Sequence, residues 1–312
     1  MGKTAIVFPG QGAQLVGMGH DVAARFASAR RTFDQAADLL KFDLAKVCFS
    51  GPATELDQTD VAQPALFVTS VAIWRALEEC GLASDLAPAA AAGLSLGEYT
   101  ALWLAGSLSF EAGVTLVRER GRLMQAAADA KPGSMVSVMG LAPPQVEDVC
   151  RAAAVGEVLA PANFNAPGQI VISGDKGACD RSLAAIEQAG GRGVALRVAG
   201  AFHSPLMQPA ADGLRRELAS TTIIAPRIPV VSNVSADYHR DPASIRESLV
   251  TQVARPIQWQ GSIERLVADG FDRFVEVGAG RVLSGLIRKI SRGVQTVNYS
   301  SADAIAPAGA AI

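Results

Sequence analysis

The residue best placed to do chemistry is Ser95, at the centre of a Gly-x-Ser-x-Gly pattern over residues 93–97. The four alanines at residues 89–92 are typical of a buried parallel strand, and the residues from Glu98 onward are typical of a helix. Between a strand and a helix, this pattern predicts a nucleophile elbow, because the glycines permit a sharp turn that exposes the serine hydroxyl. A plain tight turn is the alternative interpretation.

An activated serine needs a general base, and the chain has only three histidines. His203 lies in an apolar loop, residues 200–206, between a predicted strand and a predicted helix. In parallel sheets such loops gather at the strand ends, where active sites form. We expect His20 and His239, which have polar neighbours, at the surface. His203 is therefore the candidate base for Ser95, and a buried histidine bonded to backbone is the alternative.

Arg120 lies within the apolar stripe of a predicted helix. Its apolar neighbours at helical spacing are Leu116, Val117, Leu123, Met124 and Ala127. A guanidinium in such a place is costly without an anionic partner. That partner is either an internal Asp or Glu, or a substrate carboxylate held by the two-pronged guanidinium. Arg118 and Arg122 fall off the stripe, and we expect both to face solvent.

A glycine-rich loop, residues 9–14 (PGQGAQ), follows the first predicted strand. It matches the start of a dinucleotide-binding fingerprint, but Leu15 stands where the third glycine belongs, so that interpretation fails. The same glycines would let the backbone N–H of Gln11 approach an oxyanion. A tight turn without a chemical role is the alternative.

The composition is that of a folded chain, with 312 residues, 49% hydrophobic and 19% charged. The formal net charge of −2 and the absence of a Lys/Arg run argue against nucleic acid as a partner. Four scattered cysteines without a C-x-x-C pair predict free thiols, a reducing cytoplasmic location and no metal site. Pro88, Gly93, Gly97 and Gly106 interrupt the nearly uncharged residues 86–110, so we expect no membrane span.

Strand-like and helical segments alternate, which predicts an α/β fold with a mostly parallel sheet covered on both faces. The expected strands are residues 4–8, 89–92, 228–233 and 273–277. The expected helices are residues 35–40, 65–82, 110–128, 242–253, 261–268 and 282–290.

The middle of the chain has a different order, with strand, helix, two strands, helix and strand between residues 133 and 199. This order is typical of a ferredoxin-like arrangement. We therefore expect a ferredoxin-like subdomain at residues 132–199, inserted into a discontinuous catalytic domain of residues 1–131 and 200–300. The Ala- and Pro-rich tail, residues 301–312, is expected to be frayed.

Five motifs together carry a family resemblance. They are, in order, residues 9–14 (PGQGAQ), 93–99 (GLSLGEY), 120–125 (RGRLMQ), 163–169 (NFNAPGQ) and 252–259 (QVARPIQW). In this combination the chain resembles the malonyl-CoA:acyl carrier protein transacylases of fatty acid synthesis. The resemblance runs from the first strand to about residue 290, and five ordered motifs are more specific than one elbow.

The resemblance implies an α/β-hydrolase-like core with a ferredoxin-like insertion and a ping-pong transfer of malonyl groups. Carried onto matching positions, the resemblance implies Ser95 as the nucleophile and His203 as the general base, with Gln252 supporting the histidine through its side-chain or backbone carbonyl. It implies that the backbone amides of Gln11 and Leu96 form the oxyanion hole. It also implies that Arg120 binds the malonyl carboxylate. It implies no bound cofactor, because malonyl-CoA is a substrate and the acyl carrier protein brings its own phosphopantetheine. We expect a monomer.

Two positions bear on specificity. Leu94 stands where the family usually has histidine, beside the nucleophile. Residues 201–203 (AFH) resemble the malonyl-selecting loop of polyketide acyltransferases. A bulky Phe202 there would crowd an α-substituent on the acyl group, and ordinary packing of Phe202 in the core is the alternative.

A polyketide acyltransferase, a serine hydrolase and a catalytically silent carrier-docking module are the competing interpretations. For carrier docking, the candidate basic residues, equally explained as a solvated helix face, are Arg281, Arg288, Lys289 and Arg292.

Overall fold

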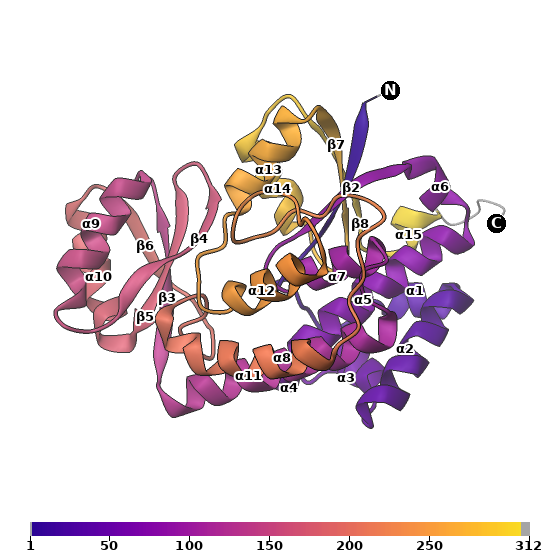
Figure 1. Ribbon diagram of the computed structural model, residues 1–312, viewed down its shortest axis with the longest axis horizontal. Helices are drawn as coiled ribbons and strands as arrows, with labels where there is room; N and C mark the ends of the chain where they lie inside the picture. The colour runs from indigo at the N-terminus through magenta and orange to yellow at the C-terminus, as the bar shows by residue number, and fades with distance from the viewer. Residues whose placement is uncertain (1, 307–312) are drawn as a thin grey trace.

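The computed structural model describes residues 2–306 (Figure 1). The first sheet has the strand order β2-β1-β7-β8, and every adjacent pair is parallel. Its strands are β1 (Lys3–Phe8), β2 (Pro88–Gly93), β7 (Phe271–Val277) and β8 (Gln295–Tyr299). The predicted α/β fold with a mostly parallel sheet is confirmed.

Helices cover both faces of this sheet because side chains on alternate residues of its strands point to opposite cores. Ile6 and Phe8 of β1 belong to the larger core, while Ala5 and Val7 belong to the smaller one. The helices of the larger core include α2 (Ala27–Leu40), α5 (Thr59–Glu79), α7 (Gly97–Leu104), α8 (Phe110–Ala130), α11 (Gln208–Ser220) and α12 (Pro242–Gln252). Those of the smaller core are α13 (Trp259–Ala268) and α14 (Val282–Ile290).

The other helices outside residues 133–199 are short. They are α1 (His20–Arg25), α3 (Leu44–Ser50), α4 (Ala53–Leu56), α6 (Leu82–Leu86), α15 (Ala302–Ile305) and the 3₁₀ turn η1 (Pro205–Met207). The helix expected from residue 65 begins at Thr59, with Pro64 inside it. Pro64 is the sixth residue of the helix, so its ring removes the one i→i−4 hydrogen bond that an N–H there would donate to the Asp60 carbonyl, and the helix continues through it to Glu79.

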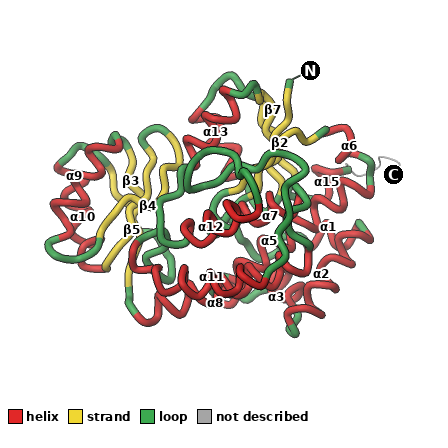
Figure 2. Tube along the Cα trace, in the orientation of Figure 1, coloured by secondary structure: helices red, strands yellow, loops and turns green. Residues whose placement is uncertain are grey.

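A second, antiparallel sheet forms one end of the molecule, at the left of Figures 1 and 2. It is built from β3 (Gly133–Met139), β4 (Leu159–Ala166), β5 (Gln169–Asp175) and β6 (Arg192–Ala195), in the order β4-β5-β3-β6. Helices α9 (Pro143–Ala154) and α10 (Lys176–Gln188) pack on it around a separate small core. The observed element order between residues 133 and 195 is the one read from the sequence.

Three segments differ from expectation. Residues 228–233 do not form a strand: Val230 makes one isolated parallel bridge to Ala91, because Pro229 has no N–H to donate. Strand β8, which the sequence reading missed, is a half-exposed edge strand with β-branched and aromatic residues. The prediction of a frayed tail is wrong for its first part, because Ala302 and Ile305 of α15 are buried. Residues 307–312 lie outside the described residues.

The turn between β2 and α7 is a tight elbow. Ser95 adopts a left-handed backbone conformation with φ of 51°, which costs energy for a residue other than glycine. Gly93 and Gly97 pack so closely that a Cβ on Gly93 would lie 1.9 Å from the Gly97 carbonyl carbon. A Cβ on Gly97 would lie 2.1 Å from the backbone oxygen of Phe8. The glycines are therefore required by close backbone contact, as the elbow interpretation predicts.

Gly97→Ala should destabilise the fold by about 2 kcal/mol or more, because the new methyl group meets backbone that cannot move aside. The matched control is Gly285→Ala in α14, where a Cβ would have no neighbour within 4 Å and alanine favours the helix by up to about 1 kcal/mol. Urea unfolding followed by circular dichroism measures both. Equal midpoints for the two variants would contradict the steric account.

Candidate active site

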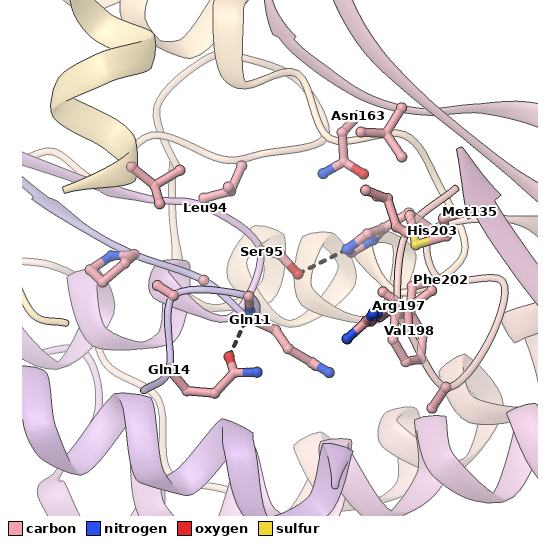
Figure 3. A pocket seen from close by; sticks show the side chains of 18 of the residues that line it. Gln11, Gln14, Leu94, Ser95, Met135, Asn163, Arg197, Val198, Phe202 and His203 are labelled. Carbon is pink, nitrogen blue, oxygen red and sulfur yellow. Dashed lines mark hydrogen bonds between the residues drawn. The ribbon is translucent and has the colours of Figure 1, made fainter. Parts of the chain in front are cut away.

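The structure brings Ser95 and His203 together. The Ser95 hydroxyl lies 2.9 Å from His203 Nε2, although the two residues are 108 positions apart (Figure 3). His203 Nδ1 lies 2.8 Å from the backbone oxygen of Gln252, at the end of α12. Since a carbonyl oxygen only accepts, Nδ1 carries the proton and Nε2 is left to accept from the serine hydroxyl. The histidine is therefore held as the tautomer that a general base for Ser95 requires.

His203 is only 5% exposed, and its protonated form is disfavoured. Burial, with a smaller contribution from the Arg120 charge, lowers the pKa of His203 to about 3. The Gln252 carbonyl opposes the shift but does not reverse it. At neutral pH the imidazole is consequently uncharged and able to take a proton.

Arg120 is 1% exposed and points from α8 to the serine. Its Nη2 donates to Ser95 Oγ and to Gln252 Oε1, each at 2.9 Å, and its Nη1 donates to Gln63 Oε1 at 2.7 Å. Among residues 2–306, no Asp or Glu forms an ion pair with this guanidinium. The internal salt bridge left open by the sequence reading is thus not observed. Arg122 is exposed as expected, whereas Arg118 is half-buried over Phe42.

Asn233, which the sequence reading missed, holds the elbow from the side. Its Oδ1 accepts from the backbone N–H of Ser95 at 2.6 Å, and its Nδ2 donates to the Gly93 carbonyl at 2.8 Å. One amide side chain therefore ties the strained residue to the strand before it. Its place at the end of the apolar run 228–233 was the available signal, but its contact with Ser95 spans 138 positions.

Glu98 and His239 form a buried pair beneath the site. His239 Nε2 lies 2.8 Å from Glu98 Oε1, and the two side chains are 1% and 0% exposed. The expectation that His239 lies at the surface is wrong, because this carboxylate draws the histidine into the interior. His20 is exposed as expected. Glu98 also accepts from Gln252 Nε2 at 2.8 Å, so the pair is connected to the site.

Gln11 lines the cavity together with Ser95 (Figure 3), and Leu96 follows Ser95 immediately before α7. Within the described part of the chain, no protein acceptor is found for the backbone N–H of either residue. Both amides therefore remain available to a bound oxyanion. Their position fits the predicted role without testing it.

The cavity around Ser95 has a volume of about 910 Å³ and lies between the two sheets. Its walls come from the loop at residues 9–14, from α8, from the second sheet and from α14. Among its lining residues are Leu94, Met124, Met135, Asn163, Asn165, Gln169, Arg197, Phe202 and Val282. Phe202 is 5% exposed and both lines the cavity and packs in the larger core. A wall that is mostly apolar with a few polar side chains is typical of a small-molecule site.

Two other features, a metal-binding cluster and a membrane-spanning helix, are absent from the residues that the structure describes. No group of three or more His, Cys, Asp or Glu side chains is placed to hold a metal ion. No helix in residues 2–306 is long and apolar enough to cross a membrane.

The chain matches the family described as acyl transferase domain over residues 5–308. It is 43% identical over 313 residues to the malonyl CoA-acyl carrier protein transacylase of Salmonella typhimurium, with 100% of this chain and 99% of that protein covered. The protein of the same name from Escherichia coli strain K12 is 44% identical over 291 residues, which are 93% of each chain.

Solved structures agree. The acyl carrier protein S-malonyltransferase of Vibrio cholerae has a TM-score of 0.92 at 41% identity, with 97% of this chain and 98% of that chain covered. A complex of a type II PKS acyl-carrier protein with its malonyl-transacylase has a TM-score of 0.93 at 39% identity, with 97% of each chain covered. The resemblance drawn from the five motifs is confirmed, and the chain belongs to the malonyl CoA-acyl carrier protein transacylase family of acyl transferases.

Proposed function

We propose that this chain transfers the malonyl group of malonyl-CoA to the phosphopantetheine thiol of an acyl carrier protein, through a malonyl-serine intermediate, for fatty acid elongation. One observation carries the proposal. The Ser95 hydroxyl lies 2.9 Å from a neutral imidazole, His203, and 2.9 Å from a buried guanidinium, Arg120. The first can activate the serine, and the second can bind an acyl group that ends in a carboxylate.

In the first half-reaction, His203 takes the Ser95 proton as the serine oxygen attacks the thioester carbonyl of malonyl-CoA. The backbone N–H groups of Gln11 and Leu96 hold the resulting oxyanion. A single donor of this kind contributes about 3–4 kcal/mol in serine hydrolases. His203 then gives its proton to the departing CoA thiolate, and the acyl group remains on Ser95 as an ester.

In the second half-reaction, His203 takes a proton from the thiol of the carrier protein, and the thiolate attacks the malonyl-serine ester. The ester bond breaks, and His203 returns the proton to Ser95. A carbonyl oxygen behind the histidine, in place of a carboxylate, leaves the imidazole less basic than in a Ser-His-Asp triad. This is sufficient for a thioester, which is a more reactive acyl donor than an amide. No resident cofactor enters either step.

The architecture supports finer assignments. We infer that the parallel sheet is an α/β-hydrolase-like core, because Ser95 sits on an elbow between a strand and a helix. We infer that the second sheet is a ferredoxin-like subdomain, supported by its element order and its strand order β4-β5-β3-β6. The division into residues 1–131 with 200–300, and 132–199, follows these sheets. The cytoplasmic location and the monomer stay predictions.

A polyketide carrier protein is the second candidate acceptor. It is favoured by the 39% identical relative whose partner is a type II PKS acyl-carrier protein, and by the position of Phe202 in the cavity wall. In both cases we propose the exposed basic residues beside the cavity as the carrier-docking surface. They are Arg281, Arg288, Lys289 and Arg292, and Lys289 already contacts Gln169 of the cavity wall at 2.9 Å.

The transfer reaction tests the proposal. With labelled malonyl-CoA and the phosphopantetheine-bearing carrier protein of fatty acid synthesis, most of the label should reach the carrier, with little free malonate. Rapid release of malonate, unaffected by the carrier, would show a hydrolase instead. Faster transfer to a type II polyketide carrier would favour the second candidate.

Arg120→Ala should lower kcat/KM for malonyl-CoA by roughly 10- to 150-fold, the usual worth of a hydrogen bond to a charged group. Acetyl-CoA has no carboxylate to lose, so its smaller activity should change less and the ratio of the two should fall. Arg122→Ala, on the same helix but exposed and paired with Glu119, is the control and should leave both values unchanged. Equal losses with the two donors would refute the assignment.

The pH profile of acylation tests the buried histidine. Because the pKa of His203 is about 3, the base is already unprotonated above that pH, and kcat/KM should stay flat between about pH 4.5 and 7.5. The donor should be the malonyl thioester of N-acetylcysteamine, which has no phosphate to titrate. The unfolded chain binds this proton more readily, so acid weakens folding and circular dichroism must confirm the fold at each pH. A one-proton fall in activity near pH 6.5 would contradict the account.

A further inference from the structure

The charge of Arg120 has no carboxylate as a direct neighbour, yet a buried carboxylate lies one side chain away. The Gln252 amide accepts from Arg120 Nη2 through Oε1 at 2.9 Å and donates to Glu98 Oε2 through Nε2 at 2.8 Å. Only this orientation of the amide satisfies both neighbours, because guanidinium only donates and carboxylate only accepts. The amide therefore connects the cation and the carboxylate in a fixed order.

Glu98 is surrounded by donors. Besides Gln252, its carboxylate contacts the backbone N–H of Asn233 at 3.0 Å and His239 Nε2 at 2.8 Å. Glu98 is 0% exposed, so water does not screen the charge. Burial lowers the pKa of Arg120, and Glu98 is among the groups that oppose this shift.

We infer that Glu98 is a positioning residue that sets how tightly Arg120 holds the acyl carboxylate: it is the counter-charge of Arg120, relayed through the Gln252 amide, and it leaves the guanidinium free for the substrate. This inference rests on the proposed transfer of malonyl groups. It assigns to Glu98 a part in acyl selection rather than only in folding.

The consequence follows from counting charges. When His239 is a neutral imidazole, the Arg120 guanidinium and the Glu98 carboxylate sum to zero, and a bound malonyl group adds one negative charge. Without the Glu98 charge, the empty site is positive and the malonyl carboxylate neutralises it. Glu98 therefore weakens the hold of Arg120 on the acyl carboxylate, which a transferase needs because the same malonyl group must leave on the carrier thiol.

Glu98→Gln tests this with little change in shape. The new amide can still accept from Gln252 and Asn233 with its oxygen, and its NH₂ can donate to His239 once the histidine proton moves to Nδ1. Binding is measured by calorimetry in a Ser95→Ala background, which prevents turnover. Malonyl-CoA should bind roughly tenfold more tightly, while acetyl-CoA binding changes by less than about twofold. Equal changes for both, or weaker malonyl-CoA binding, would overturn the inference.

Two control variants separate charge from structure. Glu98→Asp keeps the charge and should keep the ratio of the two affinities within about twofold of the parent. Glu276 is also a 0% exposed glutamate, but it accepts from the Leu283 and Ser284 backbone N–H groups at the start of α14. Glu276→Gln should lower stability without changing the affinity ratio. A shifted ratio in Glu276→Gln would show that loss of any buried carboxylate has this effect, and would refute the specific role of Glu98.

A double-mutant cycle covers the case in which Glu98→Gln folds poorly. If Glu98 is the counter-charge of Arg120, each single change leaves one buried charge uncompensated, whereas Arg120→Met combined with Glu98→Gln removes both. The double variant should unfold at a higher urea concentration than Glu98→Gln alone. Additive losses would overturn the inference. If the unsubstituted protein binds malonyl-CoA no better than acetyl-CoA, this result contradicts the proposed malonyl transfer, on which the inference about Glu98 rests.

Discussion

The Arg120 guanidinium is buried and donates to the Ser95 hydroxyl. The elements around it exclude water from this charge but place no carboxylate of residues 2–306 in contact with it. Its direct partners are the uncharged oxygens of Ser95, Gln63 and Gln252. A buried cation satisfied only by neutral groups is a weakly compensated one. In the proposed function, part of the free energy of burying it is recovered when the acyl carboxylate binds, and this would distinguish a malonyl group from an acetyl group.

The same charge fixes the chemistry of the neighbouring base. Arg120 and burial together keep His203 unprotonated, and the Gln252 carbonyl fixes its tautomer. Gln252 thereby serves the site twice, with its backbone toward the histidine and its side chain toward the arginine. Asn233 holds the strained Ser95 backbone from a third side. Each contact joins segments more than 45 residues apart, so the site exists only in the assembled fold.

Local patterns predicted the parts that depend on local physics. Glycine spacing located the Ser95 elbow, the helical stripe located buried Arg120, and the scarcity of histidine left His203 as the candidate base. The contacts of Glu98, His239 and Asn233 could not be predicted, because each joins residues more than 130 positions apart. Nothing in the local sequence around these three residues indicates such a contact. The strand expected at residues 228–233 does not form, because Pro229 has no N–H for a ladder and the Asn233 N–H donates to the Glu98 carboxylate instead of to β2.

The central claim is that Ser95 carries the acyl group, and intact mass after brief incubation with malonyl-CoA tests it most directly. The account predicts one malonyl adduct on the natural chain and none on Ser95→Ala, with His203 and Arg120 unmodified. An adduct that persists in Ser95→Ala, or release of CoA by that variant at the natural rate, would contradict it.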